Sequence, residues 1–187
     1  MTENTTKRKS EKPADAQWKS PIQDAPRQPA TNETWSRFSD DLVGALYALE
    51  EGEHLVINVK GTGRYVQFMD QGRFGMRVES VSDYYLPEDE HLSEQDYGLL
   101  VKFGWLAPTR LPDEFGRDSD GSPNYFVDLA QPVSLQDVAM LAVLTLINVH
   151  AAGHPGNLEY DARTDEGGFI RFPHLRIRRR REKALGS

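Results

Sequence analysis

The sequence predicts an α+β domain in which helices cover an antiparallel sheet of four or more strands. Two observations predict this fold class. Between residues 55 and 79, apolar and polar residues alternate in three short runs separated by glycine-containing turns, and on both sides of this region apolar residues recur at helical spacing. Because alternation leaves one face of a sheet apolar, that face needs a second layer, which the helices supply. The expected order is helix, three strands, helix, strand and helix (α-β-β-β-α-β-α).

The three consecutive strands are expected at 55–60, 65–69 and 74–79. In the first of them the alternate residues Leu55, Ile57 and Val59 are apolar, and the other two follow the same pattern. Tight turns at 61–63 and 70–72 separate the strands, and glycine in both turns supplies the positive φ that short hairpins need. The pattern indicates an antiparallel meander with one buried face.

A helix is expected before the strands, beginning at Glu33 and ending at Gly52. Thr31 or Asn32 can cap its first turn. Its apolar residues recur at helical spacing on one face. They are Trp35, Phe38, Leu42, Leu46 and Leu49. This face is expected to pack on the sheet, which makes Trp35 a core residue.

A second helix and two further strand regions follow the meander. Ser93 and Asp96 have the spacing of a capping box and begin the helix. The β-favouring run at 124–129 predicts a fourth strand. Segments 158–162 and 169–172 are expected to form a late hairpin.

A third helix is expected to begin after Ser134 and to include an almost wholly apolar run at 138–149. A helix that is apolar on so much of its surface either packs on more than one side or buries one side against a partner. The run is too short to span a membrane.

The chain divides into three parts. Residues 1–32 are polar and rich in proline, so they bury too little apolar surface to offset the cost of ordering and are expected to be disordered. Residues 33–175 are expected to form a single domain, and 176–187 a basic C-terminal tail.

Charge is unevenly distributed along the chain. The net charge is −7, but residues 33–175 hold 24 acidic and 10 basic residues and so carry −14. Such an acidic body disfavours nucleic acid over its main surface and attracts basic or mixed-charge peptides. The run from Arg176 to Lys183 could instead bind phosphates of nucleic acid or anionic lipid. The alternative is a basic tail that folds back on the acidic body.

The absence of cysteine excludes disulfides, thiolate metal sites and a cysteine nucleophile, and fits a cytoplasmic protein. The chain also lacks a membrane-spanning apolar run, and its first residues lack the order of a signal peptide.

His150 and His154 are spaced as two metal ligands on one helix face would be. Gly153 between them and Pro155 after them indicate that the helix ends there, so a helix-end pair is the preferred interpretation. His150 would then lie near the negative end of the helix dipole. No metal site is therefore predicted.

No motif identifies a reaction. The sequence Gly61-Thr62-Gly63-Arg64 lacks the lysine and the following helix of a phosphate-binding loop and is interpreted as a hairpin turn. Ser80 and Ser82 lack the surroundings of an activated nucleophile. The chain is expected to be non-enzymatic, without a cofactor.

Several short pieces, in this order and spacing, resemble the TY-Chap families of bacterial domains, which are related to type III secretion chaperones and YbjN-like proteins. The pieces are Trp35-Ser36-Arg37-Phe38, Tyr65-Val66-Gln67-Phe68, Val78-Glu79-Ser80, Gly104-Trp105-Leu106-Ala107-Pro108, Asn124-Tyr125-Phe126 and His154-Pro155-Gly156-Asn157-Leu158. The resemblance covers roughly residues 33–162.

The resemblance implies a non-enzymatic, peptide-binding chaperone or adaptor, with homodimers known among the related secretion chaperones. An apolar groove between sheet and helices would accept an extended peptide, or the peptide would add to a sheet edge. The residues expected to line this binding surface are Tyr65, Gln67, Met76, Trp105 and Tyr125. The alternative function is a regulatory protein that docks on nucleic acid or anionic membrane through its Arg-rich tail.

Overall fold

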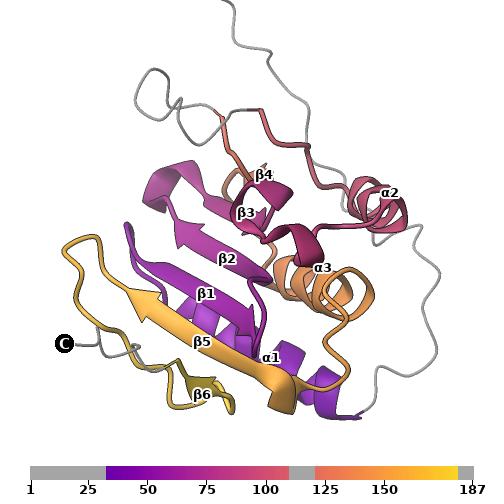
Figure 1. The fold of residues 1–187 in the computed structure, drawn as a ribbon. Helices are drawn as coiled ribbons and strands as arrows, with labels where there is room; N and C mark the ends of the chain where they lie inside the picture. The colour runs from indigo at the N-terminus through magenta and orange to yellow at the C-terminus, as the bar shows by residue number, and fades with distance from the viewer. Residues whose placement is uncertain (1–32, 110–120, 181–187) are drawn as a thin grey trace, which may run out of the picture.

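The computed structural model describes residues 33–109 and 121–180. The described helices are α1 (Glu33–Tyr47), α2 (Glu94–Lys102) and α3 (Leu135–Asn148). The described strands are β1 (His54–Val59), β2 (Tyr65–Asp70), β3 (Met76–Ser80), β4 (Tyr125–Leu129), β5 (Leu158–Arg163) and β6 (Arg178–Arg179). The α+β class and the order of the first seven elements are confirmed (Figure 1).

All six strands form one sheet in the order β4-β3-β2-β1-β5-β6. Every neighbouring pair is antiparallel except β5 and β6, which are parallel. The late hairpin forms only in part, because Phe169 makes a single bridge to Arg163 instead of beginning a strand. The short strand β6 pairs with β5 further along the same edge.

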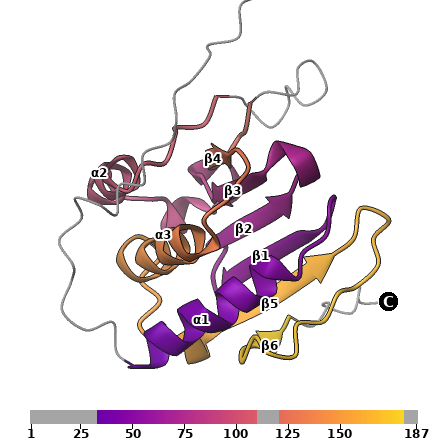
Figure 2. The same ribbon diagram turned by 180° about the vertical axis from the view of Figure 1, so that it is seen from behind.

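Helices α1 and α3 lie on one face of the sheet, as Figures 1 and 2 show from its two sides. The alternate apolar residues of the strands point at these helices and are buried against them. The core includes Leu42, Leu46, Leu55, Ile57, Phe68, Val78, Leu141 and Leu146. Helix α3 contacts α1, α2 and β2. Packing on more than one side is therefore sufficient to explain the apolar surface of α3.

The predicted capping box at the start of α2 is present. Ser93 Oγ accepts a hydrogen bond from the Asp96 amide, and the Asp96 carboxylate accepts one from the Ser93 amide. Ser134 caps α3 by accepting from the Asp137 amide. Helix α1 is shorter than expected, because it ends at Tyr47 and Gly52 lies in the turn before β1.

The connection between β2 and β3 is longer than the tight turn expected from the sequence. Residues Gly72–Phe74 form a short 3-10 helix, so Phe74 lies outside β3 and is 65% exposed. Gly75 then begins the return with φ at 108°, and a Cβ there would lie 1.8 Å from the carbonyl oxygen of Leu129. The close approach of β4 therefore requires glycine at this position.

Among the described residues, no helix has both the length and the apolar character needed to cross a bilayer.

Candidate functional site

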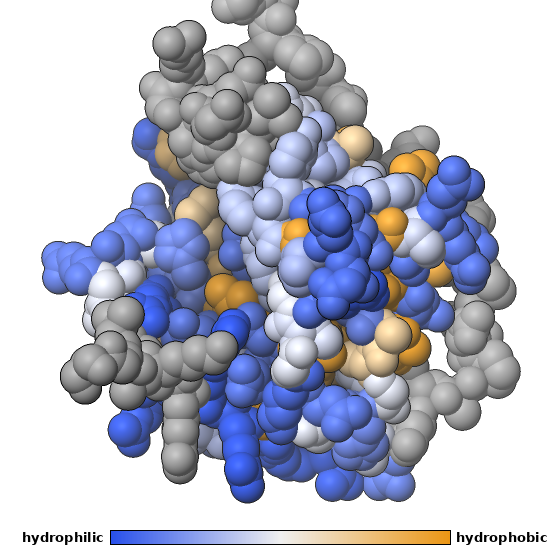
Figure 3. All heavy atoms as spheres, viewed as in Figure 1, coloured by the Kyte–Doolittle hydropathy of each residue, from blue (hydrophilic) through white to orange (hydrophobic). Residues whose placement is uncertain are grey.

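The sheet face opposite α1 and α3 is covered by none of the three helices (Figures 1 and 2). We call it the open face. Register and alternation place the following residues on it: His54, Val56 and Asn58 of β1, Tyr65, Gln67 and Met69 of β2, Arg77 and Glu79 of β3, Phe126 and Asp128 of β4, and Glu159, Asp161 and Arg163 of β5. In Figure 3, hydrophilic residues dominate this side and only a few hydrophobic ones lie among them.

The open face is therefore not an apolar groove. The alternating strands direct most of their apolar residues into the core beneath α1 and α3. What remains outside is a mixture of aromatic, amide and charged side chains, with Val56 and Met69 half-buried among them. Recognition on such a surface depends on polar and aromatic contacts more than on burial of aliphatic side chains.

Glu79 lies at the centre of a hydrogen-bonded cluster on the open face. Gln67, which is directly opposite on β2, donates from Nε2 to Glu79 Oε2 at 2.5 Å. Asn124 donates from Nδ2 to the same oxygen at 3.1 Å and to the Tyr65 hydroxyl at 3.3 Å. Glu79 is 8% exposed, so the carboxylate is enclosed by its neighbours. We call Tyr65, Gln67, Glu79 and Asn124 the Glu79 cluster.

Two phenol groups lie close to this carboxylate. Burial raises the pKa of Tyr65 to about 12, while the hydrogen bond with Asn124 acts in the opposite direction and the negative charge of Glu79 adds to the rise. Burial and the Glu79 charge also raise the pKa of Tyr85, which is 43% exposed. Both tyrosines are therefore neutral at physiological pH, and the Tyr65 hydroxyl accepts from Asn124, which also donates to Glu79.

Tyr125 belongs to a different environment. It lies on the helix side of β4 and stacks on Tyr97 of α2, with ring centroids 6.3 Å apart. The Tyr97 hydroxyl donates to the Asp83 carboxylate, and this hydrogen bond, together with burial, raises the pKa of Tyr97 to about 12. The stacking of Tyr97 on Tyr125 packs α2 against the end of the sheet.

An ion pair between β3 and β4 also lies on the open face. Arg77 donates from Nε and Nη2 to the two carboxylate oxygens of Asp128, at 2.7 and 2.8 Å. The same guanidinium lies 5.5 Å from the centre of the Phe126 ring. A bidentate pair of this kind fixes the planar guanidinium in one orientation.

The structure brings together two of the five residues predicted to line the binding surface. Tyr65 and Gln67 lie on the open face in the Glu79 cluster, and Tyr125 lies on the opposite face. Met76 and Trp105 are each 3% exposed and belong to the core. Trp105 Nε1 donates to Thr145 Oγ1 at 3.0 Å, which joins the segment after α2 to α3.

Sequence reasoning did not include Glu79 among the candidate binding residues. The alternation along β3 could have indicated the position of Glu79, because it places Glu79 on the same face as Arg77. The register then places Glu79 beside Gln67. The contribution of Asn124 could not be predicted, since it depends on how the loop before β4 returns to the sheet.

The family model named TY-Chap3, described as T3SS (YopN, CesT) and YbjN peptide-binding chaperone 3, matches residues 28–164. The chain belongs to this family. The match confirms the resemblance seen in the sequence and includes the whole Glu79 cluster. No curated protein and no solved structure matches the chain.

The two histidines at the end of α3 have separate roles in the TY-Chap3 domain. His150 is buried, and its Nε2 lies 3.0 Å from the Ser80 hydroxyl. Burial, and then the nearby Arg64 charge, lower the pKa of His150 to about 3. The core therefore keeps the ring neutral, so its place near the negative end of the helix dipole brings no charge interaction. His154 accepts the Gly156 amide through Nδ1 and caps a short turn.

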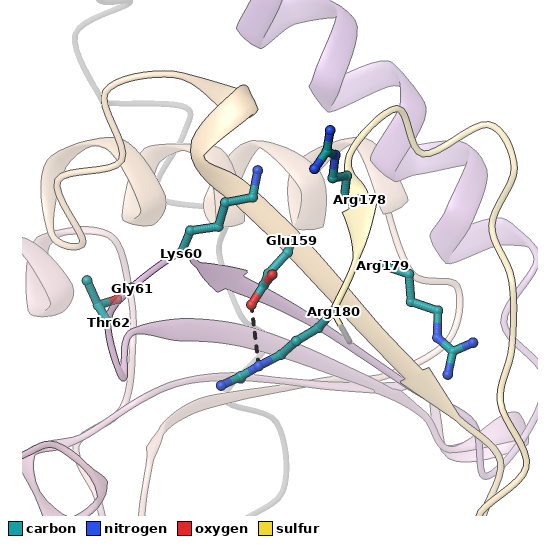
Figure 4. A pocket seen from close by; sticks show the side chains of 7 residues that line it. All are labelled: Lys60, Gly61, Thr62, Glu159, Arg178, Arg179 and Arg180. Atoms are coloured by element: carbon teal, nitrogen blue, oxygen red, sulfur yellow. Dashed lines mark ion pairs between the residues drawn. The ribbon is translucent and has the colours of Figure 1, made fainter. Parts of the chain in front are cut away.

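A hollow of about 1030 Å³ lies beside β6. It is lined by Lys60, Gly61, Thr62, Glu159, Arg178, Arg179 and Arg180 (Figure 4). Arg180 pairs with Glu159 at 3.3 Å and donates to Asn58 Oδ1 at 2.9 Å. Arg179 points away from the other cations and lies 4.0 Å from the centre of the Phe169 ring.

The expected basic tail thus begins as part of the sheet. Of the two interpretations of this run, folding back on the acidic body describes residues 176–180, because Arg176 also pairs with Asp41 at 3.6 Å. Residues 181–187 of the expected tail lie outside the described residues, as do 1–32. Residues 165–187 also lie beyond the TY-Chap3 match.

Ending the chain after Ile177 should lower the free energy of unfolding by about 1–2 kcal/mol without unfolding the domain. The truncation removes a two-residue strand pairing, the contacts of Arg180 with Glu159 and Asn58, and the contact of Arg179 with the Phe169 ring, which are individually weak. Urea denaturation measures the change. A chain that ends after Arg180 is the matched control and should retain the stability of the full protein; an unfolded 1–177 chain would show that β6 is essential.

Proposed function

We propose that this TY-Chap3 domain is a non-enzymatic chaperone or adaptor that binds extended polypeptide segments across its open face. The observation that carries the proposal is the Glu79 cluster, an aromatic and polar group on a sheet face that no helix covers. It occurs in a family described as peptide-binding. The amide, hydroxyl and carboxylate groups of the cluster can bond to main-chain and side-chain groups of a peptide lying across the strands.

The open face is a better binding surface than either edge of the sheet. On the β4 edge, Leu106 and Phe126 exchange both of their main-chain hydrogen bonds. On the β5 edge, Arg180 donates its amide to Tyr160 and Ile170 donates to Ala162. A client strand could pair with either edge only after these segments had moved, whereas none of the three described helices lies over the open face.

The Ser80 and His150 pair gives no support to an enzymatic alternative. Ser80 is fully buried and His150 is 2% exposed, so a substrate cannot reach the hydroxyl. Of the described carboxylates, none accepts a hydrogen bond from His150, which would be needed to orient an activated imidazole. The pair is better explained as a polar contact within the core.

The four methionines provide a direct test of the binding face. Met69 lies on the open face, Met140 lines a hollow between α1 and α3, and Met76 is in the core. We propose titrating protein labelled with ¹³C in its methionine methyl groups with reduced and alkylated ribonuclease A, an unfolded basic polypeptide. The Met69 signal should shift or broaden, and the Met140 signal should stay in place.

Two outcomes of this titration would contradict the proposal. A shift of Met140 without Met69 would place the binding surface on the helices. If neither signal shifts at a millimolar concentration of the unfolded ribonuclease A, the domain does not bind unfolded chains on these faces. Folded ribonuclease A is the control and should leave both signals unchanged.

A homodimer and a cytoplasmic location remain parts of the proposal that need their own experiments. The hollow of about 250 Å³ between α1 and α3, with Trp35, Val43 and Met140 in its lining, is the candidate contact between two copies. Light scattering after size-exclusion chromatography distinguishes the 21.2 kDa chain from a dimer. Cell fractionation addresses the location.

A further inference from the structure

Glu79 is an enclosed carboxylate without an ionic partner among the described residues. Its Oε2 accepts from the side-chain amides of Gln67 and Asn124, which are both neutral donors. Its Oε1 accepts from no described residue and is not one of the buried atoms that lack a partner, so it contacts solvent. Covering a charged group is costly unless an opposite charge or several donors compensate for the lost water. The two amides compensate Oε2, and Oε1 is open to an incoming donor.

Two arginines next to or within β2 and β3 contact other groups. Arg77, two positions before Glu79 on the same face, makes its bidentate pair with Asp128. Arg64 donates to the carbonyl oxygens of Val149 and Glu90. The charge of Glu79 is therefore not neutralised by a contact with either arginine.

The negative charge is also not required for the contacts that Glu79 makes. A glutamine carbonyl at this position could accept from both amides without the cost of enclosing an ion. The surroundings nevertheless suit a cation, since the Tyr65 hydroxyl and the Glu79 carboxylate share the Asn124 side-chain amide, and the charge of Glu79 acts on Tyr85. An aromatic face beside a carboxylate attracts both guanidinium and ammonium groups. The −14 charge of residues 33–175 acts in the same direction at long range.

We infer that Glu79 is the docking point for an arginine or lysine side chain of a bound peptide, with Tyr65 and Tyr85 flanking the cation. This inference rests on the proposed function and specifies the chemistry of the client: an extended segment with at least one basic residue. The enclosed carboxylate supplies the ionic contact, and the neighbouring strands supply the surface on which the rest of the segment lies.

A pair of peptides tests the inference on the unaltered protein. One is an unstructured eleven-residue peptide of serine, threonine and valine with a single central arginine. The other has citrulline, which keeps the shape of arginine and lacks its charge. The arginine peptide should bind at least about tenfold more tightly, as expected for a charge-assisted hydrogen bond. Calorimetry or methionine-methyl titration measures both affinities.

Two substitutions connect this preference to Glu79. Glu79→Gln should bring the two affinities to within about twofold, since it keeps an acceptor and removes the charge. Gln67→Lys places an ammonium group directly opposite Glu79, so it should weaken the arginine peptide to the level of the citrulline peptide. Glu166→Gln removes one exposed negative charge in the turn after β5 and should leave the tenfold preference in place.

The outcomes separate the inference from the proposed function. Equal binding of both peptides with a shift at Met69 would contradict the role of Glu79 and leave the open face as the binding surface. A preference for arginine that persists in Glu79→Gln would assign the ionic contact to another residue and overturn the inference. A response at Met140 alone would contradict the inference together with the proposed function.

Discussion

Replacing Trp105 by alanine should lower the free energy of unfolding by about 3–5 kcal/mol, the usual cost of removing a large aromatic side chain from a core. The indole is 3% exposed, and its N–H donates to Thr145, whose hydroxyl donates in turn to the Leu141 carbonyl. Truncation would therefore open a cavity between α3 and the segment after α2. Urea denaturation followed by fluorescence or circular dichroism measures the loss.

Trp105→Phe is the companion to this experiment, because it keeps most of the ring and removes only the N–H donor. It should cost about 1 kcal/mol, the net value of one hydrogen bond. Both variants should bind unfolded polypeptide with the affinity of the unaltered chain once they are folded. If Trp105→Ala kept its stability and lost binding, Trp105 would be a peptide contact and not a core residue.

Lowering the pH from 6.5 to 5 should destabilise the protein by about 2 kcal/mol through His150 alone. The pKa of His150 is about 3 in the folded chain, below the value of 6.5 for an ordinary histidine. Between these two values the unfolded chain binds a proton that the folded chain does not, so stability falls as the pH falls, by up to 1.36 kcal/mol per pH unit. The contribution levels off about one pH unit above 6.5, where the unfolded chain no longer binds this proton.

The charged groups near His150 are Arg64, which disfavours the imidazolium, and Asp96, which favours it more weakly than burial opposes it. His150→Gln should flatten the dependence of stability on pH between 6.5 and 5, where ordinary carboxylates stay ionised. His174→Gln, at an exposed position, is the control and should leave the pH profile unchanged. An equally steep profile in His150→Gln would show that another group titrates.

Local patterns predicted most of the fold. The meander, the fourth strand and the three helices follow from alternation, helical spacing and capping residues such as Ser93 and Asp96, which depend on neighbours a few positions apart. The boundary at Gly52 and the strand position of Phe74 were wrong because tertiary contacts decide where an element stops. Strand β6 had no detectable signal, since two arginines have little preference for a strand and pair only because β5 is adjacent.

The candidate site was predictable only in part. Tyr65, Gln67, Met76 and Trp105 were all predicted to line the binding surface. Met76 and Trp105 instead belong to the core. A sequence motif does not state which face of a strand is covered, and that depends on where α1 and α3 pack. The missing counter-charge of Glu79 is a property of the surrounding surface, which no sequence pattern encodes.

The covered sheet edges have a consequence for a protein that handles unfolded chains. A long bare edge acts as a template for aggregation, because another chain can extend the ladder without limit. Here Leu106 pairs with Phe126 on the β4 edge. On the other side of the sheet, β6 consists of two charged arginines and pairs with β5. In the function proposed above, the covered edges would protect the sheet of the domain from joining a bound unfolded segment in a growing fibril.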